Sequence, residues 1–117
     1  MKPETRTVVA AIGAAILNQQ KVTSIYSHSE RGYVSIDAEL IDNRVKAYDH
    51  SRGCFIEGDL PSSVYHYGDG SYLEFKLIDQ KIDGYDYETG SFFEIKVQGK
   101  NVEVYDFGDG GYHSYSV

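Results

Sequence analysis

The chain has 117 residues, of which 41% are hydrophobic, and 18 acidic against 11 basic residues give it a net charge of −7. This length suits a single domain, residues 1–117, with one core. The negative charge argues against a nucleic-acid partner and against attraction to anionic lipid, because the field of the protein repels phosphate groups. The single cysteine, Cys54, cannot form an internal disulfide, so a disulfide-held scaffold is excluded.

Residues 1–20 are predicted to form a helix. The apolar run from Val8 to Leu17 is rich in alanine, which favours this conformation, and Thr7 is a candidate N-cap. Apolar side chains occur on every side of such a helix, which predicts burial all round rather than along one stripe. The run is too short to span a bilayer.

The same segment has a second interpretation, as a targeting sequence. Lys2 and Arg6 precede an apolar run with the length of a signal-peptide core. Glu4 among the basic residues and the missing small-x-small site argue against cleavage. We therefore expect a cytoplasmic protein, and a secreted or periplasmic one if residues 1–20 are a signal peptide.

Residues 21–117 contain five copies of one pattern, spaced by about twenty residues. Each copy has a tyrosine, an aromatic residue or histidine two positions on, usually a glycine at the fifth position and an aromatic residue at the seventh. The anchor tyrosines are Tyr26, Tyr48, Tyr65, Tyr85 and Tyr105, and their seventh-position partners are Tyr33, Phe55, Tyr72, Phe92 and Tyr112. Such self-similarity predicts a tandem array of one small structural unit.

Alternation of polar and apolar residues predicts that each unit is a β-hairpin. In the fourth unit, a two-residue turn at 88–89 would place Tyr85 opposite Phe92 and Tyr87 opposite Gly90, whose bare backbone the tyrosine ring would cover. The first unit has Arg31 where the others have glycine, which predicts an irregular turn.

Between the hairpins, three dipeptides predict tight reverse turns, namely Asp42-Asn43, Asp79-Gln80 and Gly99-Lys100. The segment 60–63 contains Pro61, which resists pairing in a central strand, so we expect a bulge or local break there.

Residues two apart in a strand share a face, and this parity separates two surfaces. Ten of the eleven tyrosines fall on one face together with most charged residues, and only Tyr115 falls on the other. The aliphatic face comprises Ile25, Val34, Ile36, Val45, Ile56, Val64, Leu73, Phe75, Leu77, Ile82, Phe93, Ile95, Val97, Val102 and Val104. The predicted fold is therefore all-β with one N-terminal helix: five tandem hairpins form a ten-stranded antiparallel meander, closed or nearly closed as a barrel around the helix.

The tyrosine face is the first candidate binding surface. Its rings, interleaved with carboxylates, could stack on a glycan, a small molecule or a protein partner, or could mediate homo-oligomer formation. The candidate ligand-binding residues are Tyr26, Tyr48, Tyr65, Tyr85, Tyr105, Tyr72, Phe92 and Tyr112. The structural alternative is that cross-strand tyrosine pairs only stabilise the sheet.

A polar mouth at one end of the barrel is the second candidate. It would be lined by Asp49, His66, Asp86 and Asp106, with Cys54 opposite them, and could hold a small ligand or cation or meet the positive end of the helix. The alternative is local, because an aspartate at the start of a turn commonly accepts hydrogen bonds from amides two residues on. The Gly-Asp-Gly triplets at 68–70 and 108–110 are likewise interpreted as turns.

The sequence indicates no catalytic residues, metal ligands or cofactor. The four histidines occupy repeat positions without a nucleophile motif or zinc-ligand spacing. Cys54 stands where other units have serine or glycine, which favours a small inward-facing side chain.

The units Tyr85-Asp86-Tyr87 and Tyr105-Asp106-Phe107, each with a glycine three residues after its second aromatic residue, resemble those of small bacterial proteins built from tandem tyrosine-rich β-hairpin repeats that have no assigned function. We expect a non-enzymatic binding or assembly module that uses the tyrosine and carboxylate face. The alternatives are a ligand or cation carrier, or an enzyme, that uses the mouth, and a secreted structural or surface protein.

Overall fold

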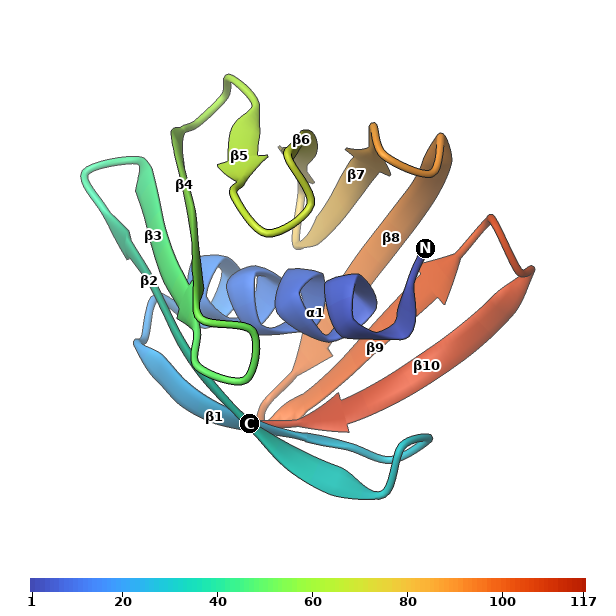
Figure 1. Cartoon of the computed structure of the whole chain (residues 1–117). Helices are drawn as coiled ribbons and strands as arrows, with labels where there is room; N and C mark the ends of the chain where they lie inside the picture. Colours follow the sequence, from blue (N-terminus) through green and yellow to red (C-terminus); the bar gives the residue numbers. More distant parts are fainter.

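The computed structural model describes residues 1–117 as one helix and ten strands that form a closed antiparallel barrel (Figure 1). The elements are α1 (Pro3–Asn18), β1 (Val22–Ser27), β2 (Gly32–Ile41), β3 (Arg44–Asp49), β4 (Cys54–Asp59), β5 (Val64–His66), β6 (Ser71–Ile78), β7 (Lys81–Asp86), β8 (Ser91–Gln98), β9 (Asn101–Asp106) and β10 (Gly111–Ser116). Each strand pairs with the next along the chain, and β10 returns to pair with β1. This meander is the predicted fold.

Helix α1 lies inside the barrel, so the prediction of burial on every side is confirmed (Figure 1). Every residue from Thr5 to Ile16 is buried. Gly13 permits this fit, because a Cβ atom there would lie 2.7 Å from the side chain of Ile95 on β8. Burial of the helix and of the aliphatic strand faces together supplies the hydrophobic stabilisation of the domain.

The helix begins four residues earlier than its predicted cap. Lys2 is the N-cap residue and Pro3 follows it, a position that suits proline because its missing N–H has no intrahelical acceptor there. Thr7 lies within the helix, and its hydroxyl donates to the carbonyl oxygen of Pro3 at 3.1 Å. The prediction of Thr7 as N-cap is therefore wrong.

The five hairpins share one turn of four residues rather than the predicted two. In the fourth hairpin Tyr85 pairs with Phe92 as predicted, and the N–H of Gly90 donates to the carbonyl of Asp86 at 2.8 Å. Gly90 has a φ of +68°, in the left-handed region that glycine adopts at little cost. Tyr87 lies in the turn instead of opposite Gly90, so the prediction that its ring covers the backbone of Gly90 is wrong. The nearest side-chain atom is the hydroxyl oxygen of Tyr85, 3.6 Å from where a Cβ atom of Gly90 would be.

The first hairpin has the same turn length, with Arg31 held at a φ of +56° where the others have glycine. The backbone hydrogen bond that closes the other four turns is not made there. Instead, the N–H of Glu30 donates to the hydroxyl of Ser27 at 3.2 Å. The expected irregularity is thus one of hydrogen bonding, and not of length.

The opposite end of the barrel carries the short connections. Two-residue turns occur at the three predicted dipeptides. Around Pro61 the sheet is interrupted as predicted: β5 has three residues, and β4 pairs with it only at Ile56–His66 and Glu57–Tyr65. Leu77 was expected in the core but is 57% exposed, because it lies next to the last residue of β6, at the rim where the interior ends.

The turns also join the hairpins into a ring. In each turn the first residue donates its backbone N–H to a carbonyl of the adjacent hairpin, over 3.0–3.1 Å. Tyr87 donates to Tyr72, and His28 donates to Ser114 across the junction between β1 and β10. These bonds support the closure, where the strand ladder itself pairs only Tyr26 with Ser116 and Ser27 with Tyr115.

Candidate functional site

The mouth residues predicted from sequence do gather at one end of the barrel. Asp49, His66, Asp86 and Asp106 each end a strand that enters a four-residue turn, and each is at most 1% exposed. Cys54 is the cross-strand partner of Asp49. The strand alternation places all of them inward.

Three of these side chains bind mainly to their own turns. Asp49 accepts from the N–H and the hydroxyl of Ser51 at 3.0 and 2.6 Å, and Asp86 accepts from the N–H of Glu88 at 3.0 Å. Nδ1 of His66 accepts from the N–H of Asp69 at 3.1 Å. This is the arrangement of an aspartate or histidine that fixes a turn, as the local alternative predicts.

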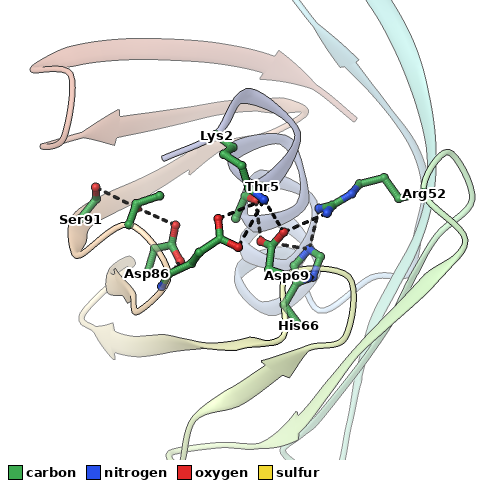
Figure 2. Close-up of polar contacts among 9 residues, drawn as sticks. Lys2, Thr5, Arg52, His66, Asp69, Asp86 and Ser91 are labelled. Carbon is green, nitrogen blue, oxygen red and sulfur yellow. Dashed lines mark hydrogen bonds and ion pairs between the residues drawn. The ribbon is translucent and has the colours of Figure 1, made fainter.

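Asp69, which the sequence indicates only as a turn residue, is the centre of the mouth. Its carboxylate accepts from Nζ of Lys2 at 2.7 Å, from the hydroxyl of Thr5 at 2.8 Å and from Nη2 of Arg52 at 2.9 Å (Figure 2). Burial alone would raise the pKa of Asp69, but these hydrogen bonds outweigh it and lower the pKa to about 2. Asp69 therefore joins the start of the helix to two hairpin turns.

Arg52, His66 and Cys54 pack tightly beside Asp69. Nη1 of Arg52 lies 3.5 Å from Nε2 of His66, and burial lowers the pKa of this histidine, so it remains neutral at pH 7. Burial raises the pKa of the Cys54 thiol, which opposes formation of a nucleophilic thiolate. A Cβ atom at Gly68 would lie 2.7 Å from the Cys54 sulfur, so this glycine is required by close packing.

A second charged contact joins the helix to the last turn. Nη1 of Arg6 lies 3.2 Å from a carboxylate oxygen of Asp106 and 3.5 Å from one of Asp109. The amino group of Met1 lies 3.0 Å from the same oxygen of Asp106. Asp109 also accepts from Nε2 of His113 at 2.9 Å.

Asp106, Asp109 and His113 are the one group with the geometry of metal ligands, since one ligand atom from each lies within 4.8 Å of the others. Arg6 already contacts both carboxylates, however, and the Met1 amine contacts one of them. Positive charge from the chain itself thus neutralises the carboxylates that a cation would need.

One signal in the sequence could have revealed Asp69. Asp69 and Asp109 are the third residues of their turns, within the two Gly-Asp-Gly triplets, and Lys2 and Arg6 are four apart on the helix. Residues four apart lie on the same side of a helix. Two turn aspartates could have been matched to two helix cations on that basis.

On the outer surface, each anchor tyrosine is the centre of an aromatic cluster. Tyr85 packs edge-on against Tyr87 and Phe92, with both ring centroids at 4.7 Å and interplanar angles of 81° and 61°. Equivalent contacts occur in all five hairpins, with centroids 4.6–5.0 Å apart and angles of 61–83°. The rings thus make the predicted sheet-stabilising pairs.

The flanking rings of these clusters remain open to solvent. The anchors Tyr26, Tyr48, Tyr65, Tyr85 and Tyr105 are half-buried. More than half of each of the following side chains is exposed: Tyr33, Phe55, Tyr67, Tyr72, Tyr87, Phe92, Phe107 and Tyr112. Monomeric proteins rarely expose so many large rings on one band of surface, because each forfeits hydrophobic stabilisation.

Carboxylates alternate with the anchors around the outside of the barrel. Four anchors have an acidic residue of the adjacent hairpin as cross-strand partner: Asp37–Tyr48, Glu57–Tyr65, Glu74–Tyr85 and Glu94–Tyr105. The hydroxyl of Tyr87 donates to Glu74 at 2.8 Å, and this hydrogen bond raises the pKa of Tyr87. His50 lies 2.9 Å from Asp37 in the equivalent position.

Two shallow depressions on this outer surface combine the rings with the carboxylates. One has a volume of about 300 Å³ and lies over β6–β8. The other, of about 210 Å³, lies over β2–β4. The first is lined by Glu74, Lys76, Asp83, Gly84, Tyr85, Tyr87 and Phe92, and the second by Lys21, Asp37, Glu39, Lys46, Ala47, Tyr48, Phe55 and Glu57. Both use an anchor tyrosine, its seventh-position partner and its cross-strand acid.

A further depression of about 460 Å³ lies at the opposite end of the barrel, beside Asn18 at the end of the helix. It is lined by no aromatic ring and no carboxylate side chain. The surface that combines both groups is therefore the outer face.

Comparison with known proteins found no matching family model, curated protein or solved structure. The single helix, α1, lacks the length and apolar character needed to cross a membrane.

Proposed function

We propose that this protein is a non-enzymatic binding module that uses the outer tyrosine and carboxylate face of the barrel. The observation that carries the proposal is the band of rings that are more than half exposed, set beside carboxylates on the adjacent strands. Exposed rings next to hydrogen-bonding groups are enriched where proteins bind partners. Self-association through the same face is the assembly mode of this module.

The alternative function, binding of a small ligand or cation by the mouth lined by Asp49, His66, Asp86 and Asp106, has weaker support. The acceptor atoms of the mouth are engaged by backbone amides and by cationic side chains of the helix. A ligand would have to displace those bonds, whereas a ligand on the outer face would meet aromatic side chains that are more than half exposed.

A third possibility is a secreted or surface protein. In that case the first twenty residues must stay attached, because α1 supplies the centre of the core. We propose a cytoplasmic location, in which this segment serves as the central helix.

The test is a binding screen of the intact protein against neutral oligosaccharides, small aromatic molecules and basic peptides, together with light scattering. We expect at least one class to bind, or the protein to self-associate, and Phe92→Ser with Tyr112→Ser to weaken the interaction. A matched variant, Ile41→Ser with Leu77→Ser, removes exposed apolar side chains from the other end and should retain it. Absence of both binding and self-association would overturn the proposal.

A further inference from the structure

The two depressions on the outer face have the chemistry of a site for positively charged side chains. In the depression over β6–β8, Tyr85, Tyr87 and Phe92 lie with Glu74 and Asp83. Lys76 is the one cationic residue of the lining, and Nζ of Lys81, outside the lining, lies 3.7 Å from the Asp83 carboxylate. The depression over β2–β4 has three carboxylates against two lysines. The whole chain carries a net charge of −7.

Aromatic faces and carboxylates both attract cations. The face of a tyrosine or phenylalanine ring is electrostatically negative, and a guanidinium or ammonium group over it is stabilised by about 0.5–1 kcal/mol at exposed sites. A guanidinium group also matches a carboxylate in a bidentate hydrogen-bonded pair. Both interactions are available within one depression.

The ring geometry favours a cation over a sugar. Stacking of a pyranose ring across two neighbouring rings would need them to be coplanar, whereas neighbouring rings in these clusters are inclined by 61–83°. A guanidinium group is small enough to rest on one ring face beside the edge of the next. It can still reach a carboxylate on the adjacent strand.

The arrangement around the barrel favours a polypeptide over a small cation. The anchors of the two depressions, Tyr48 on β3 and Tyr85 on β7, are separated by four strand-to-strand steps. At about 4.8 Å per step this is roughly 19 Å along the sheet, the span of about six extended residues. The exposed rings Tyr67 and Tyr72 occupy the interval between them.

We infer that the outer face binds an extended polypeptide segment that places arginine or lysine side chains in both depressions. This inference rests on the proposed function and names the chemical class of the partner. Simultaneous use of the two depressions would raise the affinity above that of either alone, because the second contact forms within the complex.

The test is calorimetric and NMR titration of the intact protein with a nine-residue peptide that has arginine at its second and eighth positions and glycine or serine elsewhere. The matched ligand has citrulline in place of both arginines, which keeps the shape and removes the charge. We expect the arginine peptide to bind saturably, to shift the resonances of Tyr48 and Tyr85, and to bind about tenfold more tightly than the citrulline peptide.

Two protein variants locate the interaction. Glu74→Gln with Asp83→Asn removes two carboxylates from the larger depression, and we expect binding to weaken about five- to tenfold. Asp42→Asn with Asp79→Asn removes the same charge from turns at the other end, where asparagine suits the positive φ values of +48° and +56°. That variant should bind like the parent protein.

The outcomes separate this inference from the proposed function. Equal weakening in both variants would indicate general attraction to an acidic protein and would overturn the inference. Binding of a neutral oligosaccharide at the same rings, without binding of the arginine peptide, would overturn the cationic class and leave the proposed function standing. If no probe shifts the outer-face resonances and the protein does not self-associate, both are wrong.

Discussion

The inner and outer faces of the barrel are built from the same strands, yet they differ in almost every physical property. In β7, Ile82 and Gly84 point inward and are buried, whereas Asp83 and Tyr85 point outward and are half-buried. The inner face packs so closely against the helix that one added carbon atom would clash. The outer face holds aromatic rings with more than half of their surface open to solvent. The inner face therefore maintains the fold, and the outer face leaves its aromatic side chains accessible.

The tightest fit on the inner face shows how little room remains there. A Cβ atom at Gly84 would overlap the ring of Phe93 and lie 2.6 Å from the backbone oxygen of Glu74. The backbone oxygen cannot yield without a shift of the sheet, and the Phe93 ring is itself buried in the core. On the outer face, by contrast, side chains such as Tyr67 have open space around more than half of their surface.

The largest expected difference between the faces concerns a buried charge. Ile12→Asp places a carboxylate at the centre of the core, where we expect the loss of more than 4 kcal/mol and an unfolded protein by circular dichroism. Ile12→Val is the control and should remain folded, at a cost of about 1 kcal/mol. Tyr67→Asp on the outer face should also remain folded. If Ile12→Asp melts like the parent protein, the helix does not occupy the barrel.

The next effect concerns the charged contacts that hold the helix at the mouth. Asp69→Asn removes the charge that Lys2 and Arg52 share, and we expect a loss of about 2 kcal/mol in urea unfolding. Asp109→Asn is the matched change in the last turn. There the aspartate side chain is 46% exposed, so the loss should stay below about 1 kcal/mol. Equal losses would contradict a central role for Asp69.

Acid should destabilise the protein in two separate pH windows. The pKa of His66 is lowered in the folded state by burial, so the unfolded chain binds more protons and stability falls as the pH drops below about 6.5. Asp69 has a folded pKa of about 2 against 3.8 ordinarily, so its contribution is complete above about pH 4 and is lost toward pH 2. Urea unfolding at a series of pH values measures both steps.

His66→Asn distinguishes the two windows. Asparagine keeps an acceptor for the N–H of Asp69 and removes the titrating group. Between pH 5 and pH 7 we expect the free energy of unfolding to depend less on pH than in the parent protein. The loss of stability below pH 4 should remain. An unchanged slope near pH 6 would show that another group is responsible.

The smallest expected effect is on the outer face. Phe92→Ala removes a ring that is 62% exposed and packs edge-on against Tyr85, so we expect a loss of at most about 1 kcal/mol in thermal unfolding. Its binding to a partner should suffer far more than its stability. A loss above 2 kcal/mol would mean that the aromatic clusters serve mainly to hold the sheet together.

Most of the fold follows from alternation in the sequence. The period-two pattern assigned Tyr115 to the interior and the other ten tyrosines to the exterior, and the structure agrees. The closed barrel also followed, because an all-round apolar helix needs apolar strand faces on every side. Alternation alone wrongly predicts that Leu77 is buried. The pattern continues to the end of the strand, but the end of the strand lies outside the barrel interior.

The role of Asp69 at the centre of the mouth could not be predicted from the sequence, because its contacts join residues far apart in the chain. The Gly-Asp-Gly motif around Asp69 predicts a turn, and nothing local indicates that Lys2, sixty-seven positions earlier, reaches its carboxylate. The turn length was missed for a similar reason. Two backbone hydrogen bonds favour a turn of four residues, one from Gly90 to Asp86 and one from Tyr87 to Tyr72 in the neighbouring hairpin. Only the bond to the neighbouring hairpin depends on the assembled barrel.

Chemical nitration of tyrosine tests the separation of the two faces most directly. Native protein is treated briefly with tetranitromethane, and each of the eleven tyrosines is followed by mass spectrometry of its peptide. We expect rapid modification of Tyr33 and Tyr112, which are 79% and 66% exposed, and none of Tyr115, which is 1% exposed, until the protein is unfolded. Modification of native Tyr115 as fast as that of Tyr33 would contradict the division into a sealed interior and an accessible outer face.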